Sequence, residues 1–464
     1  MQLRTAAAVW SGKAAGSVSR RLGRGGGTAI AGLAAERVDP AVVRHLAGQA
    51  AHGAIAVTGT NGKTTTALML ERIAAEAGLL PLHNRSGSNL MRGVAATLVE
   101  EATLGGRIRD AGRRLAVLEV DEATLPLLVT EAPLRAAVFT NLFRDQLDRY
   151  GEVDAVARAW ECALAAAPAE MTTVLNADDP AVAHLARAAR GRVLTFGVED
   201  ACAATTGDEH ASDFRTCLDC GAELAYDLAF YGHLGHWRCG SCGNRRPTPD
   251  VRMTSIRDSS SGSSLEIQAP AGELRFDLPL AGLYNAYNAL AAVAGALALG
   301  LPADAAMRAL SGFSAAFGRQ ERFRIGSREV RVLLGKNPTG LNQVLRAVAA
   351  EPGPKHLLFF LNDGIADGRD VSWIWDADYE LAQPHAASVL AAGTRAEDLA
   401  LRLKYAGFGA DVPLEHDTRL AVARALAATP EGGTLHVIPT YTAMLEVREL
   451  LAKAGGKARF WEDA

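Results

Sequence analysis

A glycine-rich loop between an expected strand and an expected helix is the feature that most constrains this chain. Residues 54–57 are apolar and β-rich, whereas residues 67–77 have the composition of a helix. Between them stands the run Gly59-Thr60-Asn61-Gly62-Lys63-Thr64-Thr65. In such a loop, glycines let backbone N–H groups turn toward phosphate oxygens, and the following helix adds its positive end. We therefore expect a nucleotide-binding α/β domain around this loop.

Two side chains of the loop suit particular parts of a bound ATP. Lys63 can reach the outer phosphates, and Thr64 can place its hydroxyl on Mg²⁺. The alternative is a turn that merely joins strand to helix. It does not explain the Gly-Lys-Thr-Thr sequence, because these residues have no packing role in such a turn. The expected ATP ligands of this loop are Gly59, Thr60, Asn61, Gly62, Lys63, Thr64 and Thr65.

The order of apolar runs along the 464 residues predicts an α/β fold. Strand-like runs alternate with alanine-rich helical stretches, which is typical of a mainly parallel sheet. The expected strands of the first set are 54–57, 115–120, 136–139, 173–175 and 192–196. After a break near residue 311, a second set follows at 356–361, 387–390 and 434–438, with a helix at 396–405.

Changes of composition give the expected domain boundaries. Residues 1–50 form an N-terminal lead segment, 51–310 a central ATP-binding domain, and 311–464 a smaller Rossmann-like α/β domain. Residues 201–250 are rich in Cys, Gly, His and Trp and interrupt the central domain as an insertion. The uncharged stretch 278–303 is long enough to suggest a membrane span, but its Asn285 and Asn288 favour a buried helix.

The overall charge and the N-terminus exclude some classes of protein. A formal net charge of -4 with 49% hydrophobic residues is typical of a soluble globular protein without a bias toward nucleic acid or anionic membranes. The first residues, with Arg4, Lys13, Arg20 and Arg21 among alanines, lack the apolar segment of a secretory signal. We expect a cytoplasmic protein.

Four of the six cysteines form two Cys-x-x-Cys pairs. Cys217 and Cys220 are separated from Cys239 and Cys242 by 18 residues, which is the spacing of a zinc ribbon. Four thiolates leave no open position, so the expected zinc is structural and holds together an insertion too small to bury its own core. With a complete cysteine set, His233 and His236 are expected to be surface residues and not ligands.

The phosphate loop and five further motifs, in order, resemble those of the Mur ligase superfamily and the folylpolyglutamate synthases. The loop has the short Gly-Thr-Asn-Gly-Lys-Thr-Thr form. The others are 118–122 (Leu-Glu-Val-Asp-Glu), 140–151 with Gln146 in place of the usual His, 176–179 (Asn-Ala-Asp-Asp), 284–288 (Tyr-Asn-Ala-Tyr-Asn) and 318–321 (Gly-Arg-Gln-Glu). The resemblance implies a P-loop central domain of Mur ligase type.

The resemblance also assigns roles to single residues. It implies that Glu119 binds Mg²⁺ together with Thr64, that Asn285 faces the adenine, and that Arg319 contacts the phosphates. Classical members carry a carbamylated lysine that holds a second Mg²⁺, but residues 153–167 contain no lysine. The chain departs from the family at this point.

The C-terminal third resembles one subgroup, the MurT-type synthetase subunits of lipid II isoglutaminyl synthase. The resemblance rests on the cysteine insertion and on the segments 336–343, 367–376 and 440–445. It implies ATP-dependent amidation of the D-glutamate α-carboxylate in the lipid II stem peptide, which gives D-isoglutamine through an acyl phosphate. Lys63 and Glu119 would serve this chemistry, at the inner face of the plasma membrane, with the lipid substrate as the chain's link to the membrane.

The ammonia implies a partner, because the chain has no convincing glutaminase of its own. In the subgroup this partner is a GatD-type glutaminase, whose Cys and His are completed by an aspartate from the synthetase subunit. The candidates here are Asp370 and Asp376. An acid that orients a histidine is chemically reasonable in this role.

Two other functions stay open on the sequence. One is an amino-acid-adding ligase or a folylpolyglutamate synthase of the same superfamily, against which the missing lysine and the 336–343 segment count. The other is a zinc-ribbon P-loop ATPase that acts on nucleic acid. The absence of a basic stripe disfavours it, so no nucleic-acid partner is expected.

Overall fold

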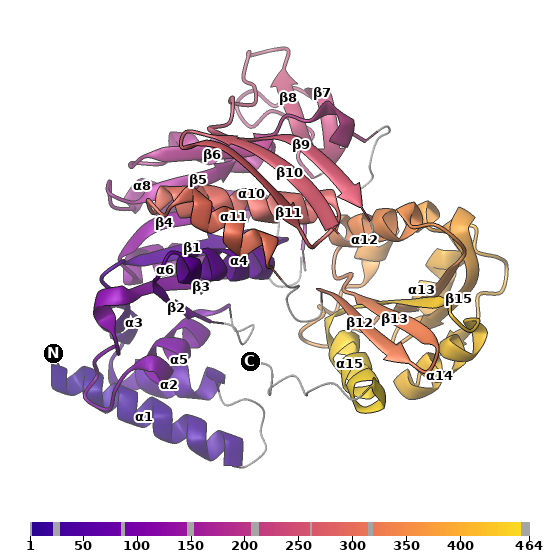
Figure 1. The fold of residues 1–464 in the computed structure, drawn as a ribbon, viewed down its shortest axis with the longest axis horizontal. Helices are drawn as coiled ribbons and strands as arrows, with labels where there is room; N and C mark the ends of the chain where they lie inside the picture. The colour runs from indigo at the N-terminus through magenta and orange to yellow at the C-terminus, as the bar shows by residue number, and fades with distance from the viewer. Residues whose placement is uncertain are drawn as a thin grey trace. The chain divides into compact units, whose positions relative to one another are not determined.

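The computed structural model describes residues 2–21, 28–84, 89–145, 153–205, 213–259, 262–313 and 319–455 (Figure 1). The chain divides into two compact units. The first comprises residues 1–142, 153–205 and 214–314, and the second comprises 143–152, 206–213 and 315–464. Each unit is built around its own β-sheet.

The first unit contains a nine-stranded sheet in the order β11-β10-β9-β6-β5-β4-β1-β3-β2. Neighbouring strands from β2 to β9 run parallel, whereas β9, β10 and β11 are antiparallel, an extension that the sequence prediction missed. The strands are β1 (Ala54–Thr58), β2 (Leu80–His83), β3 (Arg114–Glu119), β4 (Leu134–Phe139), β5 (Thr172–Asn176), β6 (Val193–Val198), β9 (Val251–Ser259), β10 (Gly262–Ala269) and β11 (Gly272–Leu278). The five expected strands of this region are confirmed.

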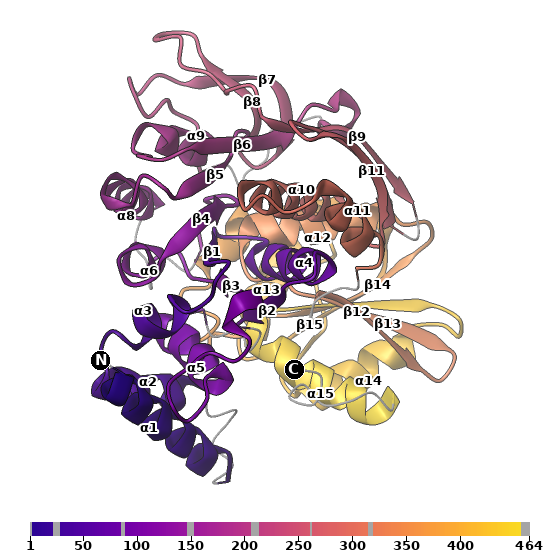
Figure 2. The ribbon, with the colours of Figure 1, turned by 60° about the vertical axis from the view of Figure 1, so that its left-hand side comes forward.

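Helices cover both faces of this sheet, which explains why its central strands are apolar throughout. Figure 2 shows α4 (Lys63–Glu76), α10 (Leu283–Ala298) and α11 (Ala303–Ser311) on one face, and α6 (Leu125–Glu131), α8 (Val153–Ala166) and α9 (Pro180–His184) on the other. Strand β1 is buried at every position. Helix α10 contains twelve buried residues, so the stretch expected to be a buried helix is one.

Helices also form the N-terminal part of the first unit. They are α1 (Gln2–Arg21), α2 (Thr28–Val38), α3 (Val42–Ala47) and α5 (Met91–Glu101). Helices α1 to α3 fall within residues 1–50, where only a lead segment was expected. Gly32 allows α2 to touch α5, because a Cβ there would lie 1.8 Å from the Arg92 carbonyl oxygen. Within the described residues, no helix has the length and apolar character needed to cross a bilayer.

The cysteine-rich stretch forms a small sheet of its own. Strands β7 (Leu224–Tyr231) and β8 (Leu234–Cys239) pair antiparallel as a two-stranded hairpin. We call residues 214–246 the cysteine hairpin. Its small apolar cluster consists of Ala183, Cys217, Leu224, Trp237 and Cys239, so it packs against α9 of the main domain.

The second unit contains a six-stranded sheet in the order β12-β13-β17-β14-β15-β16. Only the β12–β13 pair is antiparallel. The strands are β12 (Arg319–Ile325), β13 (Arg328–Leu333), β14 (Lys355–Phe360), β15 (Ala386–Ala392), β16 (Leu414–Glu415) and β17 (Thr434–Pro439). Two apolar clusters cover its faces, one with α12 (Pro338–Ala350) and α13 (Ala396–Tyr405), the other with α14 (Thr418–Ala428) and α15 (Tyr441–Gly455).

Candidate functional site

The phosphate loop lies where the chain order of the main sheet reverses. Strand β1 stands between β3 and β4, so the carboxyl ends of three parallel strands meet at one place. Ligands of open α/β sheets bind at such a point. The loop from Gly59 to Gly62 follows β1, Glu119 ends β3, and Thr140 and Asn141 follow β4.

Two glycines are required by the shape of this loop. Gly59 has φ 130° and Gly62 has φ 87°, both in the region that favours glycine. A Cβ on Gly59 would lie 2.1 Å from Thr140 Oγ1, and a Cβ on Gly62 would lie 2.0 Å from Asn288 Oδ1. The backbone of the loop is therefore packed directly against two polar side chains of the main domain.

The segment after β4 fixes the loop through hydrogen bonds. The Asn61 N–H donates to Asn141 Oδ1 at 2.8 Å, and Asn141 Nδ2 donates to the Asn61 carbonyl at 3.1 Å. Thr140 Oγ1 donates to the same carbonyl at 2.9 Å. Thr140 and Asn141 belong to a recognised motif, yet the sequence did not show that their function is to hold the loop.

Lys63 is buried at the start of α4, with 7% of its surface exposed. Its ammonium donates to the carbonyl oxygens of Gly59 and Thr60. It also lies 3.2 Å from Glu122 Oε2. Glu122 holds the lysine over the loop, a role that the sequence did not suggest.

Thr64 and Glu119 come together as the expected Mg²⁺ ligands. Thr64 Oγ1 donates to Glu119 Oε1 at 2.9 Å, and Glu119 is 5% exposed. The Asn84 side chain fixes the backbone of Glu119: the Glu119 N–H donates to Asn84 Oδ1 at 2.9 Å, and Asn84 Nδ2 donates to the Glu119 carbonyl at 2.7 Å. A hydroxyl and a carboxylate beside a phosphate loop fit the oxygen-ligand preference of Mg²⁺.

The helix start that was expected to face the adenine lies close to the loop. Asn285 is 4% exposed, and its Nδ2 donates to the Ala281 carbonyl at 2.8 Å. Asn288, one turn further along α10, is the residue whose amide lies against Gly62. Arg319 begins β12 in the second unit, and its side chain lies outside the described residues. The adenine contact of Asn285 and the phosphate contact of Arg319 stay predictions.

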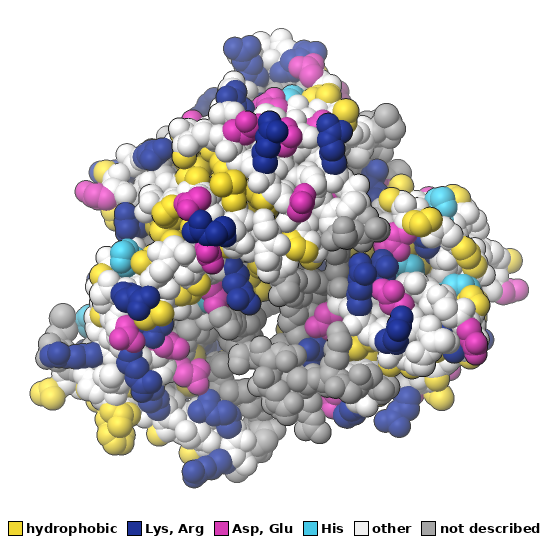
Figure 3. All heavy atoms as spheres, viewed as in Figure 1, with side chains coloured by type: hydrophobic (Ala, Val, Ile, Leu, Met, Phe, Trp, Pro, Cys, Tyr) yellow, Lys and Arg dark blue, Asp and Glu magenta, His cyan; other side chains and the backbone are white. Residues whose placement is uncertain are grey.

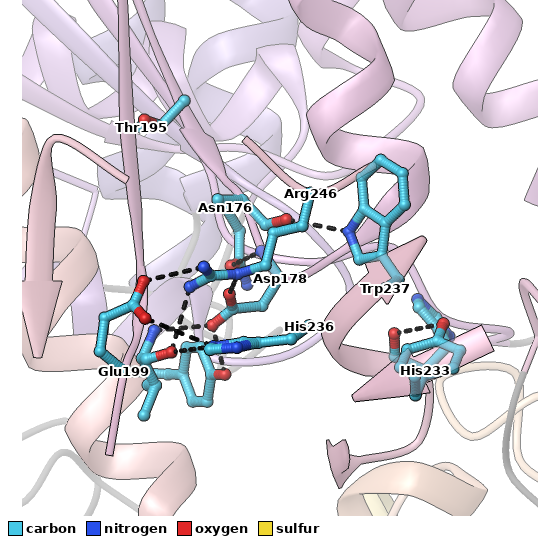
Figure 4. Close-up of polar contacts among 12 residues, drawn as sticks. Asn176, Asp178, Thr195, Glu199, His233, His236, Trp237 and Arg246 are labelled. Carbon is cyan, nitrogen blue, oxygen red and sulfur yellow. Dashed lines mark hydrogen bonds and ion pairs between the residues drawn. The ribbon is translucent and has the colours of Figure 1, made fainter. Parts of the chain in front are cut away.

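Two fully buried aspartates follow β5, in the Asn-x-Asp-Asp turn. Asp178 accepts hydrogen bonds from Tyr287 Oη at 2.6 Å and from the Val198 N–H at 2.8 Å, and it pairs with Arg246 (Figure 4). Burial raises the pKa of the Asp178 carboxyl, and Arg246 opposes this effect. Asp179 caps α9 and accepts from the Leu142 N–H at 2.8 Å. The turn thus joins β5, β6 and α10.

Arg246 connects the cysteine hairpin to this turn. Its guanidinium extends between Asp178 and Glu199, with Nη1 2.8 Å from Glu199 Oε1 and Nη2 3.1 Å from the Val198 carbonyl (Figure 4). Trp237 Nε1 donates to the Ala177 carbonyl at 3.0 Å. The hairpin is therefore bonded into the main domain at a buried site.

The expectation that both hairpin histidines lie at the surface was wrong. His233 is 0% exposed, and its Nε2 lies 3.3 Å from Asp179 Oδ2. His236 is part-buried and contacts the Val198 carbonyl through Nε2 at 2.8 Å. The hairpin packs its histidines onto the Asn-x-Asp-Asp turn, which their spacing in the sequence could not show.

The four paired cysteines converge at the end of the hairpin. The sulfurs of Cys217, Cys220, Cys239 and Cys242 all lie within 4.8 Å of one another. Cys217 and Cys239 are buried, whereas Cys220 and Cys242 are exposed. Four thiol groups at this separation fit a tetrahedral metal site.

Asp370 and Asp376 differ in their surroundings within the second unit. Asp370 is exposed and accepts a hydrogen bond from the Ser372 N–H at 2.8 Å. The hydrogen bonds from Ser372 hold the pKa of Asp370 below its usual range. Asp376, at the end of a 3₁₀ turn, lies 3.5 Å from Arg144 Nη1. Asp370 is the ionised acid that faces solvent.

The other C-terminal motif residues hold the segment that carries these acids. Asn342 of α12 exchanges two hydrogen bonds of 2.7 Å with Asp378. Asp367 is 6% exposed and accepts from the Thr442 N–H at 2.8 Å and from the Thr442 hydroxyl. We call the Asp367–Thr442 contact the clasp. Both ends of the acid-bearing segment are therefore anchored.

Comparison with known families agrees with this geometry. The profile of the Mur ligase middle domain matches residues 57–237, and that of the MurT ligase C-terminal domain matches residues 334–444. Among solved structures, MurF from Acinetobacter baumannii superposes with a TM-score of 0.67 at 20% identity, over 92% of this chain and 81% of that one. A pseudomurein peptide ligase type C from Methanothermus fervidus gives a TM-score of 0.65 at 22% identity, over 86% and 78%. These likenesses show a Mur ligase fold.

Curated relatives are similar over almost the whole chain. The lipid II isoglutaminyl synthase (glutamine-hydrolyzing) subunit MurT of Staphylococcus aureus strain N315 is 33% identical over 97% of this chain and 99% of its own length. The subunit of the same name from Streptococcus pneumoniae is 34% identical over 97% and 98%. With the phosphate loop, the anchored acid-bearing segment and both domain families in place, the chain belongs to the MurT family of the Mur ligase superfamily.

Proposed function

We propose that this chain is the ATP-dependent synthetase subunit of a lipid II isoglutaminyl synthase. It converts the D-glutamate α-carboxylate of the lipid II stem peptide to the amide, giving D-isoglutamine for peptidoglycan. The observation that carries this proposal is the similarity to MurT subunits over 97% of the chain, C-terminal domain included. The phosphate loop supplies the chemistry that the proposal needs.

The loop and its neighbours suit the binding of ATP and Mg²⁺. Lys63 would contact the outer phosphates, and Thr64 and Glu119 would hold the metal, which screens phosphate charge from an anionic nucleophile. Glu122 and Asn84 hold Lys63 and Glu119 in place before substrate arrives. Electrostatic stabilisation of this kind needs groups that are already oriented.

The reaction has two steps. A carboxylate oxygen of the substrate attacks the γ-phosphorus of ATP, and ADP leaves, so that an acyl phosphate forms. The nitrogen of ammonia then attacks the acyl carbon, inorganic phosphate leaves, and the nitrogen loses a proton. Lys63 would stabilise the phosphoryl oxygens during the first step.

Ammonia would come from a GatD-type glutaminase bound to this chain. Asp370 is the better candidate to orient the histidine of that partner, because it is exposed and its pKa is held low. Asp376 is the second candidate, and its proximity to Arg144 gives its charge a partner within the chain. An ionised acid stabilises the imidazolium that forms during glutamine hydrolysis.

Amino-acid-adding ligases match a smaller part of the chain. The diaminopimelate-adding ligase of Gloeobacter violaceus is 29% identical over 63% of this chain and 52% of its own length. The MurT match, by contrast, covers 97% of this chain. For a nucleic-acid ATPase the surface offers little support, since Figure 3 shows basic and acidic side chains interspersed over the described surface on that face.

Zinc is the metal we propose for the four cysteines. Thiolates at this spacing favour zinc in a closed structural site, which would link the turns of the hairpin that its small apolar cluster cannot hold alone. Cys220→Ser should release the metal and lower the stability of the hairpin. Elemental analysis of the wild-type chain, purified without chelator and with a reductant, tests the assignment, and a metal-free protein that keeps its fold under these conditions would refute it.

The nitrogen compound that attacks the activated carboxylate, ammonia or an amino acid, distinguishes the proposed function from its alternatives. The purified chain should amidate lipid II with ATP and ammonium, and mass spectrometry of the stem peptide should show the amide. L-lysine, diaminopimelate and L-glutamate should not be added. Ligation of an amino acid in preference to ammonia would contradict the proposal, as would failure of the tagged chain to retain a glutaminase on purification from the cytoplasm.

A further inference from the structure

The outward face of helix α1 carries an unbroken row of apolar side chains. Leu3, Trp10 and Val18 are 89%, 58% and 56% exposed, and Ala7 and Ala14 between them are exposed as well. Intervals of three and four residues place all five on one side of the helix. We call these five residues the α1 stripe.

The opposite face of α1 packs against the rest of the first unit. Ala8 and Val9 are 0% exposed and belong to the main apolar cluster. Gly12 allows close packing, because a Cβ there would lie 2.9 Å from both the Ala31 carbonyl oxygen and the Val99 side chain. The helix is thus firmly attached through one face while it presents an apolar stripe on the other.

The charges on α1 are all positive. Arg4, Lys13, Arg20 and Arg21 lie on the helix, and it contains no aspartate or glutamate. Arg20 approaches Glu100 at 3.7 Å, but both side chains are more than half exposed, so this pair neutralises little. A basic helix on a chain of net charge -4 favours an anionic surface and opposes pairing with a second copy of itself.

We propose that α1 lies flat on an anionic membrane, with the α1 stripe in the boundary between lipid headgroups and acyl chains. Tryptophan and leucine on one face with lysine and arginine beside them are typical of helices that bind in this interface. The proposal rests on the proposed function in one respect, since a lipid-linked substrate lies in that membrane. Binding there confines the enzyme to the surface that holds its substrate.

The position of α1 agrees with this role. Figures 1 and 2 both show α1 at the outer edge of the first unit, and apolar and basic side chains gather at that edge in Figure 3. Three large apolar side chains and four positive charges give reversible binding, which strengthens with anionic lipid and weakens with salt.

Vesicle co-sedimentation of the full chain tests the proposal. The wild-type chain should bind vesicles of phosphatidylglycerol and phosphatidylcholine at low salt, and bind less to phosphatidylcholine alone or at high salt. The double variant Leu3→Ser/Trp10→Ser should reduce the bound fraction at least about fivefold, because it removes the largest members of the stripe. Arg20→Gln/Arg21→Gln should remove the preference for the anionic lipid.

The matched control is Leu104→Ser/Leu127→Ser, which alters two leucines of the same unit that are each 51% exposed. It should bind vesicles as the wild-type chain does. Equal binding by the stripe variant and this control would overturn the proposal, and so would a wild-type chain that ignores anionic vesicles. If the double variant fails to fold, Ala14→Glu on the exposed face provides the same test.

Measurements of amidation with a soluble and with a membrane-embedded substrate test the membrane proposal separately from the proposed function. Amidation of a water-soluble stem peptide should be the same in the stripe variant and the wild-type chain, whereas amidation of vesicle-embedded lipid II should fall in the variant. Vesicle binding without any amidation would refute the function alone. Stripe-dependent self-association in sedimentation velocity, with no vesicle binding, would instead identify a second copy as the occupant.

Discussion

In the two units, the carboxyl edge of a parallel sheet is arranged in different ways. At the edge of the first sheet, Gly59 and Gly62 carry no side chains, so the backbone of the loop that follows β1 packs closely against its neighbours. At the corresponding edge of the second sheet, between β14 and β17, polar side chains bond to each other. Asn362 accepts from the Thr394 N–H at 3.0 Å, and the clasp joins Asp367 to the start of α15.

The same kind of parallel-sheet edge is thus arranged differently in the two units. The first edge carries a glycine-containing loop, a helix start and Lys63, and in the proposed function this edge would bind the phosphates of ATP. The second edge satisfies its own polar groups and holds the neighbouring segment in a fixed shape, from which Asp370 projects into solvent. In the proposed function, this edge would present Asp370 to the glutaminase partner.

Replacing Lys63 by alanine should have the largest effect, because it removes the buried cation of the first edge. Lys63→Ala should reduce amidation to background with either glutamine or ammonia, since both need the acyl phosphate. Phosphate release and stem-peptide mass spectrometry measure this, with circular dichroism to confirm the fold. The control Lys453→Ala alters a lysine that is 58% exposed. Activity near that of the control would disprove the role of the loop.

Replacing Asp370 should lower amidation with glutamine as the nitrogen source but not amidation with free ammonia. Asp370→Asn should lower glutamine-dependent amidation by about 10³–10⁴-fold, as loss of a triad acid does elsewhere. Amidation with excess ammonium should survive, because activation of the carboxylate does not need this acid. Asp376→Asn should have the smaller effect. If the two variants behave in the opposite order, Asp376 is the orienting acid, and joint loss of both activities would make the segment structural.

The cysteine hairpin should contribute to the first edge through Arg246. Arg246→Met leaves the Asp178 carboxylate buried without its cation, which costs about 3–5 kcal/mol. Thermal unfolding measures the loss of stability. Weaker ATP binding by the variant would show that the disturbance at Asp178 extends to α10 through Tyr287. Arg238→Met on the same hairpin breaks an exposed pair with Asp227 and should be nearly neutral. Equal unfolding temperatures for the two variants would contradict the prediction.

Breaking the clasp should loosen the second edge. Asp367→Ala leaves the Thr442 N–H without its acceptor, at a cost of about 1–3 kcal/mol. Hydrogen exchange should then increase across the segment that carries Asp370. Asp363→Ala changes a half-buried acid of the same segment and should leave exchange near Asp370 as it was. Unchanged exchange in Asp367→Ala would show that the clasp is not what fixes the segment.

The smallest effect on stability is expected from replacing Glu351, which lies far from both sheet edges, and this effect depends on pH. Burial alone would raise the pKa of Glu351, but its hydrogen bond with His436 and the charge of Arg331 outweigh burial and lower it. A lowered pKa adds stability above the unfolded value, and this stability is lost as the pH falls through the folded value. Glu351→Gln should therefore cost about 1 kcal/mol at neutral pH and nothing in acid. Exposed Glu431→Gln is the control, and a cost that persists in acid would refute the assignment.

The sequence predicted most of the central parallel strands because they are short apolar runs, but it did not predict the parallel strands β2, β13 and β16. It missed β9 to β11, whose residues alternate between apolar and charged, and it missed α1, whose apolar residues recur at helical intervals along an alanine-rich stretch. That periodicity was available as a signal. A lead segment was expected there because no motif marked it.

At the site, the sequence named the residues of the phosphate loop but not the groups that hold them. Local spacing places Lys63, Thr64 and the two glycines on one turn. The partners Glu122, Asn84 and Asn141 come from other strands, so their contacts depend on which strands are neighbours. The burial of His233 likewise required the hairpin to be placed on the Asn-x-Asp-Asp turn.

The arrangement of the four sulfurs has a consequence for handling the protein. The short approaches are Cys217 to Cys242 at 3.6 Å and Cys220 to Cys239 at 3.5 Å, and each joins one Cys-x-x-Cys pair to the other. A metal-free chain exposed to an oxidant therefore has thiols of both pairs placed to form disulfides across the hairpin. Such bridges would hold the hairpin closed without metal, so stability alone would be a poor measure of metal content unless a reductant is present.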